Sequence, residues 1–384
     1  MTDLDSECPP TTDGEIAVMN LQSARLRSWS RFFQHPLPPG VAEILIEQEQ
    51  FTAQFVGHLS ALDRVECLTR QLVESDAGST RTLLIQAQVA SMLHRFSDAR
   101  YYLAQAERGG AAPADDVKRL RLSIDQACGL DLGAVMDARR EIAAKSGRLE
   151  DLVALGALLA DLSEFSEADD VYRQALRSYS DVSPFAVAWV CFQLGVLWGE
   201  LTTEPDLAVA EQWYRKAITC LPGYVKARVH LAEICSSDGR TSDAEKLLVP
   251  ALASGDPEVH WRLADVLTAA GRHCEADAQL DAARSGFEAL LERHLLAFAD
   301  HGAEFYAGSG CDALRALQLA RINVDNRPTL RAFEQAYTIA VAAGETGAAT
   351  ELLAACTKRW GHTSAFRLSS LAQHRLDNRE GVAA

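Results

Sequence analysis

The sequence lacks the short motifs by which most familiar enzymes are recognised. It has no G-x-x-x-x-G-K phosphate loop, no G-x-G-x-x-G after a predicted strand, no G-x-S-x-G turn and no H-E-x-x-H metal site. We therefore expect no enzymatic activity of a familiar class, no catalytic residues and no cofactor.

Positive charge is scarce. The 384 residues carry 37 Lys and Arg against 53 Asp and Glu, which gives a formal net charge of −16. An acidic surface repels phosphate backbones and anionic headgroups, so we expect neither nucleic acid nor membrane as a partner. With 48% hydrophobic residues, the chain has enough apolar surface to fold.

Paired cysteines and long apolar runs are also absent. The nine cysteines include no C-x-x-C pair, and such an unclustered set is typical of reduced thiols that pack in the interior. The first residues are not basic and no apolar run follows them, so we expect no secretory signal. No uninterrupted apolar stretch approaches the roughly 18 residues of a spanning helix. Together these features predict a cytoplasmic protein.

From Val41 onward, strand-like alternation is missing and apolar residues recur three and four apart, which predicts helix after helix. Six of the seven prolines after Pro39 fall at expected helix boundaries, where the missing amide proton costs least. Pro250 lies inside the run 244–252 and predicts either a kink or an early helix end.

The pattern Ala-x-x-x-large-x-x-Ala recurs along the chain. It begins at these alanines, the last of them in a looser copy: Ala99, Ala168, Ala210, Ala244, Ala276 and Ala313. Spacings of 244 − 210 = 34 and 276 − 244 = 32 residues are typical of helical solenoids, and 168 − 99 = 69 leaves room for a degenerate copy around Ala134.

A large-small dipeptide precedes these alanines in Leu155-Gly156, Leu194-Gly195, Leu231-Ala232 and Leu263-Ala264. Two helices approach closely only where neither carries a bulky side chain, so each dipeptide is predicted to lie in the first helix of a pair. Gly239 and Gly271 fall between the helices, where a positive φ ends the first one.

These residues resemble the tetratricopeptide repeat (TPR) family. The best copy contains Leu194-Gly195, Trp198, Ala210, Tyr214, Ala217 and Pro222, with three extra residues between its helices and a Sel1-like segment over 206–218. The resemblance covers roughly residues 80–360. It implies an all-α solenoid, a right-handed superhelix of helix pairs whose first helices line a concave groove.

The expected organisation has four parts. Residues 1–40 form a partly flexible segment with one helix, and 41–78 form N-terminal helices that make a degenerate repeat or cap. The TPR-like array covers 79–362, and 363–384 form a capping helix and tail.

The resemblance also implies which residues face the groove, where they would bind another protein or a peptide. Projected from the best copies, they are Trp189, Phe192, Gln193, Lys226, Val229, His230, Glu233, Trp261, Arg262 and Asp265. Aromatic anchors dominate many interfaces. The alternative is that Trp189, Phe192 and Trp261 simply pack adjacent repeats together.

Three functions remain open. The first is a scaffold or adaptor that binds protein through the groove, alone or assembled with copies of itself. The second is a peptide-responsive regulator that acts on residues 15–72. The third is a metal-binding accessory protein, because the spacing of His294, His301 and Glu304 would stack them along one helix face.

Overall fold

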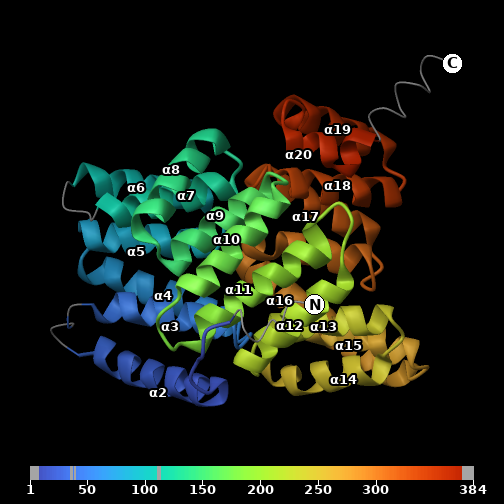
Figure 1. Cartoon of the computed structure of the whole chain (residues 1–384), viewed down its shortest axis with the longest axis horizontal. Helices are drawn as coiled ribbons and strands as arrows, with labels where there is room; N and C mark the ends of the chain where they lie inside the picture. The colour runs from blue at the N-terminus through green and yellow to red at the C-terminus, as the bar shows by residue number, and fades with distance from the viewer. Residues whose placement is uncertain (1–7, 35–37, 39, 110–113, 374–384) are drawn as a thin grey trace.

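The computed structural model describes residues 8–34, 38, 40–109 and 114–373, and no strand occurs in these ranges (Figure 1). The ends that were expected to be flexible lie partly outside them, at 1–7 and 374–384. The chain begins with these helices: α2 (Gly14–Phe32), α3 (Val41–Gln54), α4 (Ser60–Ser75), α5 (Thr80–Met92), α6 (Phe96–Arg108), α7 (Ala114–Ala127) and α8 (Leu132–Ser146).

The region of strongest repetition follows as consecutive antiparallel pairs. The pairs are α9 (Leu149–Asp161) with α10 (Phe165–Ser178), α11 (Pro184–Val196) with α12 (Leu207–Cys220), α13 (Val225–Ser237) with α14 (Thr241–Leu248), and α15 (Pro257–Ala269) with α16 (His273–Ala307). The chain ends with α17 (Ala313–Asn326), α18 (Leu330–Ala342), α19 (Thr346–Trp360) and α20 (Ser364–Leu368). The predicted all-α helical repeat is confirmed.

Small residues bring the paired helices together, as the dipeptides predict. A Cβ on Gly156 would lie 2.7 Å from the ring of Tyr172, and a Cβ on Gly195 would lie 2.6 Å from the ring of Tyr214. Both tyrosines occupy the central large position of the alanine motif. Gly239 and Gly271 have φ of 75° and 74° between the helices of their pairs, as expected.

The degenerate copy predicted around Ala134 lies in α8, displaced by one residue. Val135 and Met136 are buried there, and Arg139 is buried at the position that Tyr172 takes 33 residues later. Burial lowers the pKa of Arg139 to about 10. A polar residue in the central position explains why the motif fades from the sequence at this copy.

Helix α16 contains a break that the sequence does not predict. His294 has φ −135° and ψ 50°, which separates two helical halves. The second half packs on α17, and a Cβ on Gly302 would lie 3.1 Å from Leu319. One more copy follows, with buried Ala336 in α18 and Ala348 in α19, 348 − 336 = 12 residues apart.

Prolines mark boundaries as predicted, except that Pro113 lies outside the described residues. Pro184 and Pro257 occupy the first turns of α11 and α15. Pro250 corresponds to the early helix end: α14 stops at Leu248 and a 3-10 helix, η2 (Val249–Ser254), follows.

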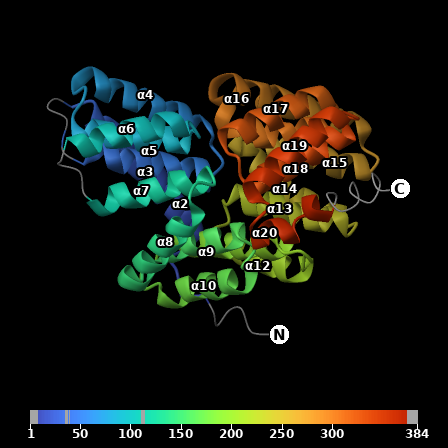
Figure 2. The ribbon, with the colours of Figure 1, turned by 90° about the horizontal axis from the view of Figure 1, so that it is seen from above.

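The array also bends until its two ends touch. Figure 2 shows α3 to α7 on one side and α16 to α19 on the other, with the green helices between them. His294 Nε2 lies 2.8 Å from Asp63 Oδ1, and Asn326 Nδ2 donates to the carbonyl of His94 at 2.9 Å. Arg359 donates to the carbonyls of Cys128 and Gly129 at 3.0 and 2.9 Å. Repeats therefore contact more than their neighbours in sequence.

The cysteine prediction is partly wrong. Cys128, Cys191, Cys235 and Cys356 are buried, but Cys67, Cys274 and Cys311 are exposed on helix and turn surfaces. One 18-residue window, 184–201, is apolar and long enough to cross a membrane, with mean hydropathy 1.4, and 56% of it is buried inside the protein. Found among the described residues, it consists of α11, a core helix of the repeat array, and the π-helical turn at 197–201.

Candidate functional site

A continuous row of charged side chains connects the first helices of three neighbouring pairs. We name it the ladder. Its members, from η1 (Leu197–Leu201), α13, α15 and the second half of α16, are Glu200, His230, Glu233, Glu258, Arg262, His301 and Glu304. Arg331 of α18 lies 3.3 Å from Glu200 although 131 residues separate them, so this end of the ladder faces a later part of the superhelix.

The first rung joins Glu200 and His230. Glu200 lies in η1 (Leu197–Leu201), a π-helical turn that extends α11. His230 Nδ1 lies 2.6 Å from Glu200 Oε1, and the Tyr214 hydroxyl donates to the same carboxylate at 3.1 Å. The imidazole ring packs against Phe192 and Tyr214, with centroids 5.1 and 5.5 Å apart.

The two partners of this rung stabilise each other's charge. Burial acts to raise the pKa of Glu200, but the His230 hydrogen bond and charge outweigh it and hold the pKa at about 2. Burial acts to lower the pKa of His230, but the bond from Glu200 and the charges of Glu200 and Glu233 raise it above its usual value. Each partner of the rung therefore favours the charged form of the other.

The second rung has one guanidinium for three carboxylates, and two imidazoles lie beside them: His230 is 3.8 Å from Glu233 and His301 is 3.8 Å from Glu258. Arg262 lies 2.7 Å from Glu233, 3.0 Å from Glu304 and 3.8 Å from Glu258, so one guanidinium serves three carboxylates. Burial raises the pKa of Glu233 to about 7, although Arg262 and His230 oppose the shift. The negative charges of all three carboxylates stabilise the protonated guanidinium of Arg262. Together they raise its pKa despite burial.

A further carboxyl group, that of Asp256, lies in the same region at the start of α15. Asp256 caps the helix by accepting from the amide of Glu258 at 3.0 Å, and its side chain is buried. Burial, together with the nearby charge of Glu258, raises the pKa of Asp256 to about 6. Glu258 keeps a lowered pKa because His301, His230 and Arg262 outweigh the effect of burial.

The structure divides the residues predicted to line the groove into two sets. His230, Glu233 and Arg262 meet in the ladder, and Asp265 accepts from Ser309, which itself accepts from the indole of Trp261. Phe192, Val229 and Trp261 are only 8%, 2% and 3% exposed. Trp189, Gln193 and Lys226 are partly buried outside the ladder contacts. Partner binding by these residues stays a prediction.

Sequence reasoning missed three members of this region. Glu258 was detectable, because it precedes Arg262 by four residues on one helix and such pairs face each other. Glu200 could be inferred only indirectly. The three extra residues between α11 and α12 allow the π-helical turn that directs Glu200 toward His230. Such turns often mark functional sites. Arg331 had no signal, because its contact depends on the bending of the whole array.

The prediction that His294, His301 and Glu304 stack along one helix face is wrong for His294, whereas His301 and Glu304 both contact α15. The break at His294 turns the helix axis, so His294 contacts Asp63 of α4. His301 Nδ1 lies 3.8 Å from Glu258, and Glu304 binds Arg262. Among the described residues, no group of three or more His, Cys, Asp or Glu side chains could hold a metal ion.

The paired helices, their alanine motif and their glycine-to-tyrosine contacts define the fold class: this is an all-α protein of helical repeats, and its helix pairs resemble those of TPR proteins. No known protein family matches the sequence, and no curated protein does. Three solved structures with a similar fold match this chain at low sequence identity.

One is the Cut9–Hcn1 hetero-tetramer of the APC/C, 13% identical over 91% of this chain and 66% of that chain, with a TM-score of 0.45. A second is IFIT1 with Gppp-AAAA, 15% identical over 96% of this chain and 88% of that chain, with a TM-score of 0.43. A third is a Rap protein complexed with Competence and Sporulation Factor, 14% identical over 73% and 87%, with a TM-score of 0.39.

Proposed function

We propose that this protein is an interaction module, a scaffold or adaptor, and that its ladder binds a basic segment of another protein. The observation that supports this most directly is the sharing of Arg262 among Glu233, Glu258 and Glu304. Carboxylates held together with one guanidinium repel one another. A lysine or arginine from a partner relieves that repulsion and gains charge-assisted hydrogen bonds.

The ladder is open to such a partner. The side chains of Glu233, Glu304 and His301 keep 34%, 52% and 38% of their surface exposed. Water reaches them although protein surrounds them on several sides. Buried aromatic residues, including Phe192 and Trp261, hold the helices beneath them rigidly, so little ordering of the site is needed on binding.

Fluorescence anisotropy with two labelled peptides of equal length, one rich in lysine and arginine and one rich in glutamate, tests the proposal. We expect the basic peptide alone to bind, with an affinity that falls as salt rises. The double variant E233Q/E258Q should weaken it about tenfold, because two charge-assisted contacts are lost. The control E351Q changes a glutamate that is 77% exposed on α19 and pairs with Arg321. Equal binding of both peptides, or an unchanged E233Q/E258Q affinity, contradicts the proposal.

The peptide-responsive regulator is a second candidate, because α13 connects the ladder to the N-terminal helices. The amide of Val225, at the start of α13, donates to the carbonyl of Phe55 at 3.0 Å, while His230 and Glu233 lie further along the same helix. Hydrogen exchange of residues 41–59 with and without basic peptide separates the two. A regulator shows a change in protection there, and a plain scaffold shows none.

The proposal also keeps the cytoplasmic location, the absence of a cofactor and self-association as predictions. Sedimentation of the purified chain measures the last of these directly. Nucleic acid remains a poor partner for the ladder, since its carboxylates outnumber its arginines.

A further inference from the structure

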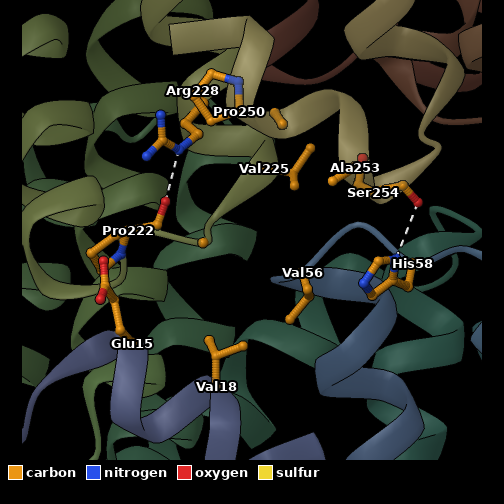
Figure 3. A pocket seen from close by; sticks show the side chains of 12 residues that line it. Glu15, Val18, Val56, His58, Pro222, Val225, Arg228, Pro250, Ala253 and Ser254 are labelled. Carbon is orange, nitrogen blue, oxygen red and sulfur yellow. Dashed lines mark hydrogen bonds between the residues drawn. The ribbon is translucent and has the colours of Figure 1, made fainter.

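A cavity of about 340 Å³ lies between the N-terminal helices and the middle repeats, away from the ladder (Figure 3). Its walls come from α2, the turn after α3, the start of α13 and η2. The apolar lining consists of Val18, Val56, Pro222, Val225, Pro250, Ala251 and Ala253. A volume near the lower end of the roughly 300–1,000 Å³ of ligand sites suits a small molecule.

Arg228 is the cation of the cavity. Its Nε donates to the carbonyl of Pro222 at 2.7 Å and its Nη1 to the carbonyl of Leu247 at 3.2 Å. Among the described residues it has no carboxylate within ion-pair distance, and burial lowers its pKa. In a protein with 53 acidic residues, a half-buried guanidinium held only by neutral carbonyls has capacity for an anion.

Two other polar side chains line the same space. Glu15, in the first turn of α2, makes no side-chain ion pair among the described residues. His58 Nδ1 lies 3.1 Å from the carbonyl of Ser254, an acceptor only, so Nδ1 donates to it and Nε2 is the ring nitrogen left for other contacts. Figure 3 shows Glu15 and Val18 on one side of the cavity, Arg228 and Pro250 opposite, and His58 beside Ser254.

This charge arrangement selects one class of ligand. A plain anion that binds Arg228 is repelled by Glu15, and a plain cation that binds Glu15 is repelled by Arg228. A zwitterion satisfies both, and the valine and proline walls take an aliphatic body. We propose that the cavity binds a free aliphatic α-amino acid, with its carboxylate on Arg228 and its ammonium on Glu15.

Such a ligand would join two parts of the chain. Glu15, Val56 and His58 belong to the N-terminal helices, whereas Arg228 belongs to α13. Occupancy therefore stabilises the docking of α2 and α3 on the middle repeats. The proposal does not depend on the partner of the ladder.

The test measures binding of L-leucine by calorimetry and by thermal shift, beside two analogues of similar size. Isovalerate lacks the ammonium group and isoamylamine lacks the carboxylate. We expect leucine to bind at least tenfold more tightly than either analogue, because each analogue leaves one charge of the site unpaired.

Three variants make the test specific. E15Q should weaken leucine about tenfold and should improve isovalerate, since the repelling carboxylate is gone. A253F places a ring in the cavity from an exposed backbone position and should abolish binding, while the matched control A354F on the exposed face of α19 should not. Retained folding of each variant is checked by its melting curve.

Failure of leucine and other aliphatic amino acids to bind the wild-type chain at millimolar concentration overturns the proposal. So does binding that A253F leaves intact, or an E15Q variant in which leucine and isovalerate change alike. None of these results bears on the ladder, whose peptide test uses different variants and a different probe.

Discussion

At the residue scale, the spacing of two helix pairs depends on a glycine, Gly156 in one and Gly195 in the other. Gly195 faces the ring of Tyr214, and the hydroxyl of Tyr214 donates to Glu200 of the ladder. Tyr214 therefore takes part both in helix packing and in the ladder. The sequence predicted a close approach of the two helices at Gly195, but not that the bulky ring of Tyr214 fills the space beside the glycine. It did not predict the hydroxyl's partner, which depends on the π-helical turn.

Replacing Gly195 by alanine should destabilise the protein. The added Cβ would lie 2.6 Å from the Tyr214 ring, and relief requires the helices to separate. We expect a loss of about 1–3 kcal/mol in the free energy of unfolding, typical of overpacking, measured by urea denaturation. The matched control is G133A in α8, where a Cβ meets nothing within 4 Å, and helix propensity should stabilise it slightly. Equal effects of the two substitutions would refute this account.

Glu233 should make the protein less stable as pH rises. Its folded pKa of about 7 exceeds its usual value of 4.5, so between these values the folded state holds a proton that the unfolded state has released. Stability is therefore highest below pH 4.5 for this group and falls as pH rises through 7. Because the side chain is 34% exposed, screening limits the effect to about 1 kcal/mol or less.

The variant E233Q should remove this contribution. We expect the loss of unfolding free energy between pH 5.5 and 8 to be smaller in E233Q than in wild type, measured by chemical denaturation at both pH values. The same titration should make the basic peptide bind more tightly at pH 8 than at pH 6 in wild type, and with a weaker pH dependence in E233Q. A pH profile identical in both proteins would show that Glu233 is ionised throughout.

At the element scale, repetition predicted the helix pairs but not their irregularities. Alanine and glycine return with the repeat, so their signal accumulates over several copies. The buried Arg139 of α8 and the break at His294 in α16 occur once each, and nothing in their local sequence distinguishes them. The π-helical turn at 197–201 is partly predictable: the extra residues can be recognised in the sequence, but the geometry of the turn cannot.

That turn should control the protonation of His230. Glu200 is brought to 2.6 Å from His230 Nδ1 by η1, and its hydrogen bond and charge raise the imidazole pKa against burial. In E200Q we expect the pKa of His230 to fall below its usual value, because burial is then less opposed. Histidine NMR titration measures it, and Y214F, which keeps Glu200, is the control. An unchanged His230 pKa in E200Q would place the raising charge elsewhere.

At the scale of the whole molecule, the contacts between the two ends distinguish this chain from an open solenoid, in which repeats touch only their neighbours. The sequence could not predict them. Each depends on one or two single residues, such as His94 in a turn, Asn326 at the end of α17 and Arg359 near the end of α19, which recur with no period. We expect these contacts to couple the ends of the array during unfolding.

His94 makes this junction sensitive to acid. It lies in the turn before α6 with φ 54°, its Nδ1 lies 3.3 Å from the carbonyl of Leu296, and its own carbonyl accepts from Asn326. Burial, and then the charge of Arg327, lower its pKa to about 4, while Asp300 partly opposes the shift. Between pH 4 and its usual value of 6.5, the unfolded chain binds a proton that the folded chain does not. Stability is therefore full above pH 6.5 and is lost as pH falls toward 4.

From that shift we expect His94 to account for about 2 kcal/mol of the unfolding free energy lost between pH 7.5 and 5. The substitution H94N tests this, because asparagine tolerates a positive φ and can donate to Leu296 without titrating. Urea denaturation should show a smaller acid-induced loss in H94N than in wild type, and hydrogen exchange should locate the difference at residues 92–96 and 294–298. If the two proteins lose equal stability, the ends of the array are held together by contacts that do not include a neutral His94.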